Sequence, residues 1–163
     1  IRSQAEAAGA VILECRGPAE LAPGLFTTGE IPRREGFEKV EGFWTIRDGQ
    51  YIPDIIPDDQ GLAAVLPGRG LAVITGCAHS GIINTIRQAQ RITGVDKIYA
   101  VIGGFHLMGA DRERIDATAR ALLELDPTVI RPGHCTGSRA VCLLQQALGE
   151  RCQPLAVGET INL

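Results

Sequence analysis

The sequence lacks the features that identify several protein classes. No apolar run approaches the roughly 18 residues of a membrane span, and no signal-peptide pattern stands at the start. Lys and Arg number 16 against 19 Asp and Glu, which gives a net charge of −3 and no basic cluster. The sequence therefore gives no support for binding to a membrane or to nucleic acid. Neither a P-loop nor a GxGxxG fingerprint is present.

Cysteine is present but follows no familiar pattern. The five cysteines are odd in number and lack CxxC spacing. This usage is typical of reduced thiols and predicts a cytoplasmic protein. Three of these residues are interpreted as core or surface thiols: Cys15, Cys142 and Cys152.

The first part of the chain, residues 1–75, is predicted to be β-rich and antiparallel. The chain begins at Ile1 without Met, inside what reads as a helix end at 2–10, so we expect a piece of a longer protein. Gly and Pro punctuate residues 17–38, which predicts short strands and loops. The other expected elements are a strand at 10–16, a hairpin across Asp48-Gly49, and a hairpin formed by 61–67 and 70–75.

The second part, residues 76–163, changes to a helical period. Apolar residues recur at helical spacing from Ile82 to Ile92, and Gly94 is placed to end that helix. A strand at 97–102, a helix capped by Asp111, a strand at 128–130 and a helix capped by Ser138 follow. A last strand is expected at 155–163. We therefore predict one α/β domain, 1–163, with a mixed sheet and helices that follow strands.

The three histidines each follow a strand and a small-residue turn. His79, His106 and His134 are spaced 27 and 28 residues apart, about one βα unit each. Right-handed crossovers place the ends of such strands at one edge, so we expect all three imidazoles there as metal ligands. Zinc is the expected ion, with manganese or iron as alternatives. The alternative for each histidine alone is a hydrogen-bonded structural residue, and His106 could instead contact substrate.

Other side chains near these corners are candidates for the same site. Cys77 and Cys135 neighbour two of the histidines and could ligate metal or act as nucleophiles, or could simply fill tight turns. Asp59, in the Asp58-Asp59 pair, could ligate metal or act as acid or base, or could cap a solvated turn.

Small residues at the same corners are expected to approach a substrate. Glycine allows tight turns and close contact between backbone and ligand. The predicted substrate contacts are Gly103, Gly104, Phe105, Thr136 and Gly137. The helix starts near Ser80 and Ser138 could hold an anion such as phosphate.

Three segments carry a family resemblance. TGCAHSGIINTI (75–86), AVIGGFHLMGA (100–110) and RPGHCTG (131–137) resemble the metallo-β-lactamase superfamily. More narrowly, they are similar to a branch of metal-dependent hydrolases related to the archaeal dihydropterin–ribofuranosylaminobenzene phosphate synthase. The resemblance runs from about Pro18 to the C-terminus. It implies an αββα sandwich of two halves with one or two metal ions at the rim between them.

The resemblance also implies which part of the fold is present. The family's HxHxDH motif is absent, so the chain looks like the C-terminal half. By this resemblance His79 matches a metal-ligand corner, His134 matches the last ligand histidine, and His106 is similar to a branch-specific histidine. Cys77 lies near the position of a bridging aspartate in relatives.

The expected function follows from the same resemblance. It is a hydrolase in which a metal ion activates water to attack an ester or phosphoester, or an enzyme that acts on a pterin-type small-molecule substrate. A complementary N-terminal half or a homodimer is the expected partner, because a bare sheet would otherwise aggregate. The alternative is a half-domain that binds a ligand or partner at the same rim without catalysis.

Overall fold

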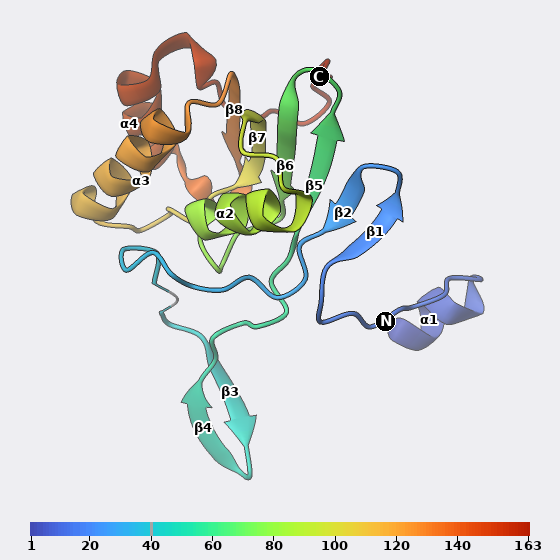
Figure 1. The fold of residues 1–163 in the computed structure, drawn as a ribbon. Coiled ribbons are helices and arrows are strands. Elements are labelled where there is room, and N and C mark those ends of the chain that lie inside the picture. The colour runs from blue at the N-terminus through green and yellow to red at the C-terminus, as the bar shows by residue number, and fades with distance from the viewer. Residues whose placement is uncertain (40) are drawn as a thin grey trace.

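The computed structural model describes residues 1–39 and 41–163 and contains a six-stranded mixed sheet with helices beside it (Figure 1). The sheet order is β1-β2-β5-β6-β7-β8. The strands are β1 (Ala19–Ala22), β2 (Leu25–Thr27), β3 (Trp44–Arg47), β4 (Gln50–Pro53), β5 (Gly61–Leu66), β6 (Gly70–Thr75), β7 (Ile98–Gly104) and β8 (Val129–Gly133). The helices are α1 (Arg2–Ala7), α2 (Ile82–Thr93), α3 (Arg112–Leu125) and α4 (Ser138–Leu148), with short 3₁₀ turns at His134–Thr136 and Gly149–Arg151. None of the helices in the described ranges is long and apolar enough to cross a bilayer.

The second part of the chain forms the predicted βαβα unit. β6, β7 and β8 are parallel neighbours, and α2 and α3 connect them. Crossovers of one hand between successive neighbouring strands put their helices on one face of the sheet, as Figure 1 shows for α2, α3 and α4. The carboxyl ends of the three strands therefore share one edge.

The core lies between this sheet and its helices. Val73, Val101 and Ile130 are cross-strand partners on the helix-covered face and are fully buried. α2 contributes Ile82, Ile83, Ile86 and Ala89 from one side, while its Arg87 and Arg91 remain exposed. The apolar periodicity read from the sequence thus identifies the buried side of this helix.

The helix ends follow the sequence signals with one exception. Gly94 ends α2 in a left-handed conformation with φ +70°, and the Asp111 carboxylate accepts a hydrogen bond from the Arg114 backbone N–H. Ser138 does not cap α4. It is the first residue inside the helix, and Gly137 occupies the cap position without a side-chain hydrogen bond.

The predicted strand at 10–16 is wrong. These residues form no strand, and the side chains of Val11 and Leu13 are 83% and 79% exposed. The run is apolar and contains β-branched residues, but no strand within residues 1–39 and 41–163 pairs with it. A strand needs such pairing, because its backbone N–H and C=O groups otherwise lack hydrogen-bond partners.

The predicted strand at 155–163 is also wrong. The chain after α4 does run along β8, because Gln153 donates to the Ile130 carbonyl and Leu155 donates to the Pro132 carbonyl. The pairing stops there. A turn at Val157-Gly158, with φ +83° at the glycine, carries the chain out of the ladder.

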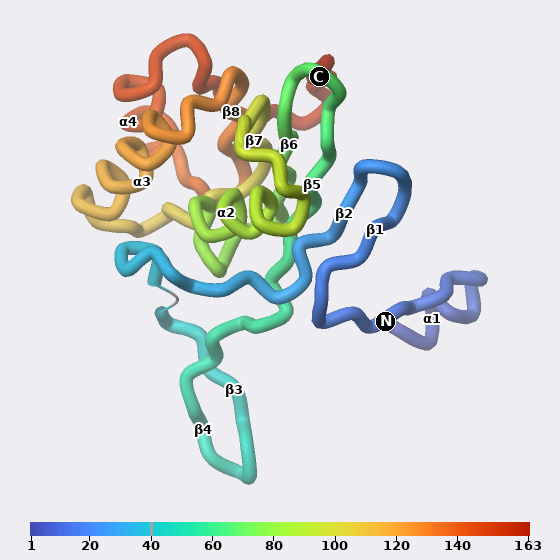
Figure 2. The backbone as a smooth tube through the Cα atoms, in the orientation of Figure 1, coloured from blue at the N-terminus to red at the C-terminus, as the bar shows by residue number. Residues whose placement is uncertain are grey.

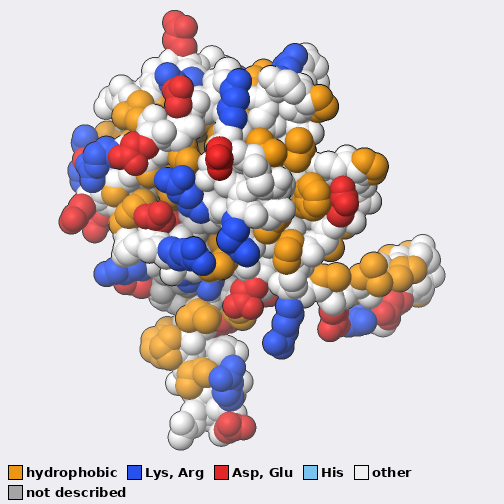
Figure 3. Space-filling model, in the orientation of Figure 1, with side chains coloured by type: hydrophobic (Ala, Val, Ile, Leu, Met, Phe, Trp, Pro, Cys, Tyr) orange, Lys and Arg blue, Asp and Glu red, His pale blue; other side chains and the backbone are white. Residues whose placement is uncertain are grey.

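The predicted hairpin across Asp48-Gly49 forms a separate two-stranded sheet of β3 and β4. Both turn residues have positive φ, as the favoured two-residue hairpin turn requires. Figure 2 traces the hairpin as an arm that extends away from the main sheet, and Figure 3 shows hydrophobic side chains along it. Trp44, Ile46 and Tyr51 are among its exposed residues.

Candidate metal centre

The three histidine corners follow β6, β7 and β8 at the shared carboxyl edge. Each corner contains one non-glycine residue in the left-handed region: Ala78 at φ +56°, His106 at +47° and His134 at +49°. Such a conformation costs on the order of 1 kcal/mol and is concentrated at functional sites. A strained residue of this kind therefore occurs at each of the three corners that carry a histidine.

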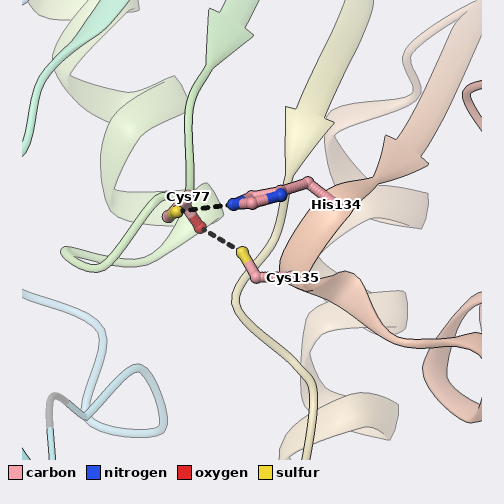
Figure 4. Close-up of side chains that lie close together, drawn as sticks. All are labelled: Cys77, His134 and Cys135. Carbon is pink, nitrogen blue, oxygen red and sulfur yellow. Dashed lines mark hydrogen bonds between the residues drawn. The ribbon is translucent and has the colours of Figure 1, made fainter. Parts of the chain in front are cut away.

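Cys77, His134 and Cys135 form one compact group, called here the Cys/His cluster. Their ligand atoms all lie within 4.8 Å of one another. The His134 Nε2 lies 3.1 Å from the Cys77 Sγ, and the Cys135 thiol donates to the Cys77 carbonyl at 3.3 Å (Figure 4). Figure 4 shows Cys77 on the loop after β6 facing the other two side chains, which follow β8.

His79 and His106 form a second group, called here the histidine pair. Their rings meet edge to face with centroids 4.5 Å apart. The ring of Phe43, at the base of the β3–β4 hairpin, lies 5.1 Å from His79 and 5.8 Å from His106. The predicted histidines therefore lie at one edge, but the structure divides them between two groups.

The two groups differ in electrostatics. Burial lowers the pKa of His106, the nearby His79 and Arg114 lower it further, and Asp59 acts in the opposite direction. His106 is thus favoured as a neutral imidazole, which is the form that binds a metal ion. Burial raises the pKa of the Cys135 thiol to about 11. This thiol is protonated at neutral pH unless a cation takes the place of its proton.

Asp59 supports the His79 corner through the backbone. Its Oδ2 accepts a hydrogen bond from the Ser80 N–H at 2.8 Å, next to His79. Asp58 is exposed. The carboxylate of Asp59 thus acts as a turn cap, and metal ligation by it stays a prediction.

Glycine at the β7 end lets the corners approach one another. A Cβ on Gly104 would lie 2.4 Å from the Gly76 carbonyl oxygen and 2.8 Å from the Cys135 sulfur. A Cβ on Gly103 would lie 2.2 Å from the Thr75 carbonyl oxygen. Only glycine fits here, because any side chain would push the β6 and β8 corners apart.

The remaining predicted substrate contacts are also tied to neighbouring corners. Phe105 and Thr136 are fully buried, and the Thr136 hydroxyl donates to the Gly133 carbonyl and accepts from the Phe105 N–H. Gly137 has φ +79°, and a Cβ there would lie 3.2 Å from Met108 Cα. These residues hold the β7 and β8 corners together, and direct contact with a substrate stays a prediction.

Comparison with known proteins shows which sequences and structures this chain resembles. No family model matches the chain. The 7,8-dihydropterin-6-methyl-4-(β-D-ribofuranosyl)-aminobenzene-5′-phosphate synthase of Methanocaldococcus jannaschii is 40% identical over 151 residues, which cover 90% of this chain and 51% of the synthase. The uncharacterized protein MJ0448 of the same organism is 33% identical over 129 residues, covering 79% of this chain and 46% of that protein.

A crystal structure decides the fold. Tm1679, a metal-dependent hydrolase of the β-lactamase superfamily, matches with a TM-score of 0.81 and 30% identity, covering 94% of this chain and 58% of that one. The chain carries part of the metallo-β-lactamase fold. This confirms the resemblance drawn from the three corner segments. The chain spans about half the length of the curated relatives it matches.

The donor set at this metallo-β-lactamase rim fits a metal ion. One imidazole and two sulfurs are ligands that zinc favours, and three protein ligands leave a fourth position open. Tetrahedral zinc with its usual bond lengths separates a nitrogen and a sulfur ligand by about 3.5 Å. The 3.1 Å between His134 Nε2 and Cys77 Sγ is close to that separation, and the Cys135 Sγ lies within 4.8 Å of both atoms.

One residue that shapes this rim has no signal in the sequence. Glu38 is 4% exposed, and its two carboxylate oxygens accept hydrogen bonds from the Ile83 and Asn84 N–H groups, both at 2.8 Å. It thereby provides hydrogen-bond acceptors for backbone N–H groups at the start of α2, the helix that follows His79. Burial raises the pKa of Glu38 to about 7, against the two backbone hydrogen bonds, which lower it. It lies 45 residues from Ile83, so no local pattern could reveal it.

Proposed function

We propose that this chain provides the C-terminal metal ligands and part of the substrate site of a metal-dependent hydrolase of the metallo-β-lactamase superfamily. The observation that carries the proposal is the Cys/His cluster at the carboxyl edge of β6, β7 and β8. A pterin-type substrate or a phosphoester is proposed because the 40% identical relative is named as a pterin-related phosphate synthase.

The residues at this rim would have different roles. His134, Cys77 and Cys135 would hold the ion, and zinc is the ion that their chemistry favours. A metal ion there supplies a Lewis acid that activates water and polarises the oxygen that gains charge. The neutral His106 imidazole can accept a proton or act as a further ligand beside His79. The Phe43 ring packs against both imidazoles and would fix their orientation.

A reducing compartment such as the cytoplasm is part of this proposal. All five cysteines are free thiols. Cys77 and Cys135 could ligate a metal ion only while they remain reduced.

The test is metal binding by the purified, reduced chain. Cobalt(II) serves as the probe, because thiolate ligation to this ion produces an intense charge-transfer absorption. We expect stoichiometric binding with that absorption, strong loss in Cys135→Ser and His134→Ala, and no change in Cys142→Ser, which removes an exposed thiol on α4. Cobalt binding without thiolate absorption, or equal loss in Cys142→Ser, contradicts the assignment. Absence of binding would favour a half-domain without metal chemistry.

A complementary half is proposed as the partner. On the sheet face opposite the helices, Leu62, Ile74 and Ile102 are cross-strand neighbours and only half-buried. Apolar faces of this kind are normally packed against another layer. Because the chain spans about half of its relatives, the rest of such a protein is the occupant that fits this face.

The probe for this partner is the half of the Methanocaldococcus jannaschii synthase that this chain does not match. Mixed with the chain, it is expected to form a one-to-one complex, measured by light scattering after gel filtration. Ile102→Lys should abolish the complex, because it places a charge on the apolar face. Leu123→Lys, on the exposed side of α3, should leave it intact. A stable homodimer that Ile102→Lys disrupts would replace this proposal.

A further inference from the structure

We propose that Cys77 and Cys135 are a peroxide-sensitive thiol pair, which closes into a disulfide and thereby removes both sulfur ligands from the Cys/His cluster. The inference rests on the proposed function, since it assigns a regulation to the same metal site. The change is a reversible two-electron oxidation of the two thiols. It adds an oxidative modification site to the rim.

The two cysteines follow strands that are not neighbours in the sheet. Cys77 follows β6 and Cys135 follows β8, and β7 lies between these strands. Adjacent strands are about 4.8 Å apart, so β6 and β8 are roughly 10 Å apart. The two sulfurs nevertheless lie within 4.8 Å of each other (Figure 4). The two corners therefore converge beyond the end of β7.

Gly104, the last residue of β7, leaves the space in which the sulfurs meet. A Cβ at this position would lie 2.8 Å from the Cys135 Sγ and 3.1 Å from the Cys77 Cα. The Cys135 thiol also donates to the Cys77 carbonyl at 3.3 Å, which holds its sulfur against the backbone of the other cysteine. Because glycine has no side chain, Gly104 places nothing between the two thiols.

The remaining distance between the sulfurs is within the range of a side-chain rotation. A disulfide bond is about 2 Å long, and staggered cysteine rotamers place the sulfur at positions about 3 Å apart. A rotamer change at one cysteine is thus large enough to bring sulfurs that lie within 4.8 Å to bonding distance. We therefore expect the disulfide to form in the folded chain.

A small oxidant can reach this pair. Cys77 and Cys135 are half-buried, and the His134 side chain beside them is exposed. Exposure alone would favour the exposed thiols of Cys15 and Cys142, so the pair is distinguished by its surroundings. The His134 Nε2 lies 3.1 Å from the Cys77 Sγ and is placed to take the thiol proton. Cys77 is therefore the sulfur that attacks first.

The reaction consumes one hydrogen peroxide and produces two waters. The Cys77 sulfur attacks a peroxide oxygen, the O–O bond breaks, and the thiol proton passes through His134 to the departing hydroxide. Cys77 is then a sulfenic acid. The Cys135 sulfur attacks the Cys77 sulfur, the S–O bond breaks, and the hydroxyl group leaves with the Cys135 proton as the second water. A dithiol reductant restores both thiols by thiol–disulfide exchange.

The experiment treats the reduced chain with one equivalent of hydrogen peroxide, in buffer with a chelator, and maps disulfides by tryptic digestion and mass spectrometry. Trypsin does not cut between Arg131 and Pro132, so the two cysteines fall in peptides 70–87 and 121–139, each with one cysteine. We expect these peptides to be linked in most chains and two of the five free thiols to disappear. Oxidation in urea should instead give mixed pairings.

Two variants test the order of the steps. Cys135→Ser should stop the reaction at the sulfenic acid of Cys77, which dimedone labels. Cys142→Ser is the matched control, because it removes an exposed thiol on α4 and should leave the linked peptides unchanged. The thiol pair is rejected if no linked peptide forms, if the folded chain pairs its cysteines as the unfolded chain does, or if dimedone labels another cysteine instead.

The outcomes separate this inference from the proposed function. The linked peptide is measured without metal, so failed cobalt binding by the reduced chain would overturn the metal site and leave the thiol pair standing. Absence of the linked peptide would do the reverse. In the oxidised chain the cobalt–thiolate absorption should fall at least tenfold and return after treatment with dithiothreitol. Absorption that persists in the fully linked chain would overturn the claim that oxidation removes the ligands.

Discussion

Glu38 makes the stability of this chain dependent on pH in a calculable way. Burial raises the pKa of its carboxyl from 4.5 to about 7. The difference of about 2.5 units corresponds to about 3 kcal/mol between the two protonation states. Because the folded state binds this proton more tightly than the unfolded chain, the contribution to stability is complete below pH 4.5. It is lost as the pH rises to 7 and changes little above that.

The assay is urea unfolding of the parent and of Glu38→Gln across that pH range. The amide imitates the protonated carboxyl, so the variant should lack this part of the pH dependence. We expect the parent to lose about 3 kcal/mol relative to the variant between pH 4.5 and pH 8. Taking the difference cancels other groups, including Arg114 and Glu35, whose charges also act on Glu38.

The control variant removes a carboxylate that is not buried against the start of α2. Glu30→Gln changes an exposed side chain and should leave the parent's pH dependence intact. If the curves of the parent and Glu38→Gln run parallel, or if the parent gains stability relative to the variant as the pH rises, the reasoning about desolvation is refuted. The second outcome would mean that the two backbone hydrogen bonds to Ile83 and Asn84 dominate instead.

Further perturbations probe the corners and the helix ends. Gly104→Ala should cost more than about 2 kcal/mol in urea unfolding, because its Cβ would collide with the Gly76 carbonyl. Gly17→Ala meets nothing within 4 Å and should change stability by less than about 0.5 kcal/mol. Asp59→Asn should lower the pKa of His106 further in an NMR titration, since the carboxylate raises it. Asp111→Ala should cost about 1 kcal/mol of thermal stability, because it removes the cap of α3. No change in Gly104→Ala, Asp59→Asn or Asp111→Ala would contradict the corresponding contact.

The parallel part of the fold could be predicted because local signals and a global rule agree there. Apolar runs of β-branched residues mark β6 and β7, helical periodicity marks α2, and Asp111 marks the start of α3. The right-handed crossover rule then brings His79, His106 and His134 to one edge. The same edge is where the structure presents them.

The grouping of side chains at that edge could not be predicted. His134 meets Cys77 and Cys135 because the chain turns through left-handed conformations at Ala78 and His134. Sequence spacing gives the position of a corner but not the direction in which its side chain points. Glu38 was missed for a related reason, since its partners at the start of α2 are distant in sequence.

The two predicted terminal strands do not form. An apolar strand pattern is a local property of the sequence, whereas strand pairing depends on a distant segment. Val11 and Leu13 have apolar side chains that suit a strand, yet no strand in the described part of the chain pairs with them. The C-terminal segment does reach β8 through Gln153 and Leu155 but leaves at Val157-Gly158. Residues 10–16 have no partner strand in the described ranges, whereas the C-terminal segment has the edge of β8 beside it and turns away from that edge.

The base of the β3–β4 hairpin gives this chain a built-in optical reporter. Trp44 is the only tryptophan of the sequence and is 63% exposed. It follows Phe43, whose ring packs against His79 and His106. Fluorescence of the unlabelled chain therefore comes from an indole next to Phe43. A displacement of Phe43 would change the surroundings of that indole and hence its emission. Ion or substrate arrival could be followed in real time by this emission, without attaching a dye to any thiol.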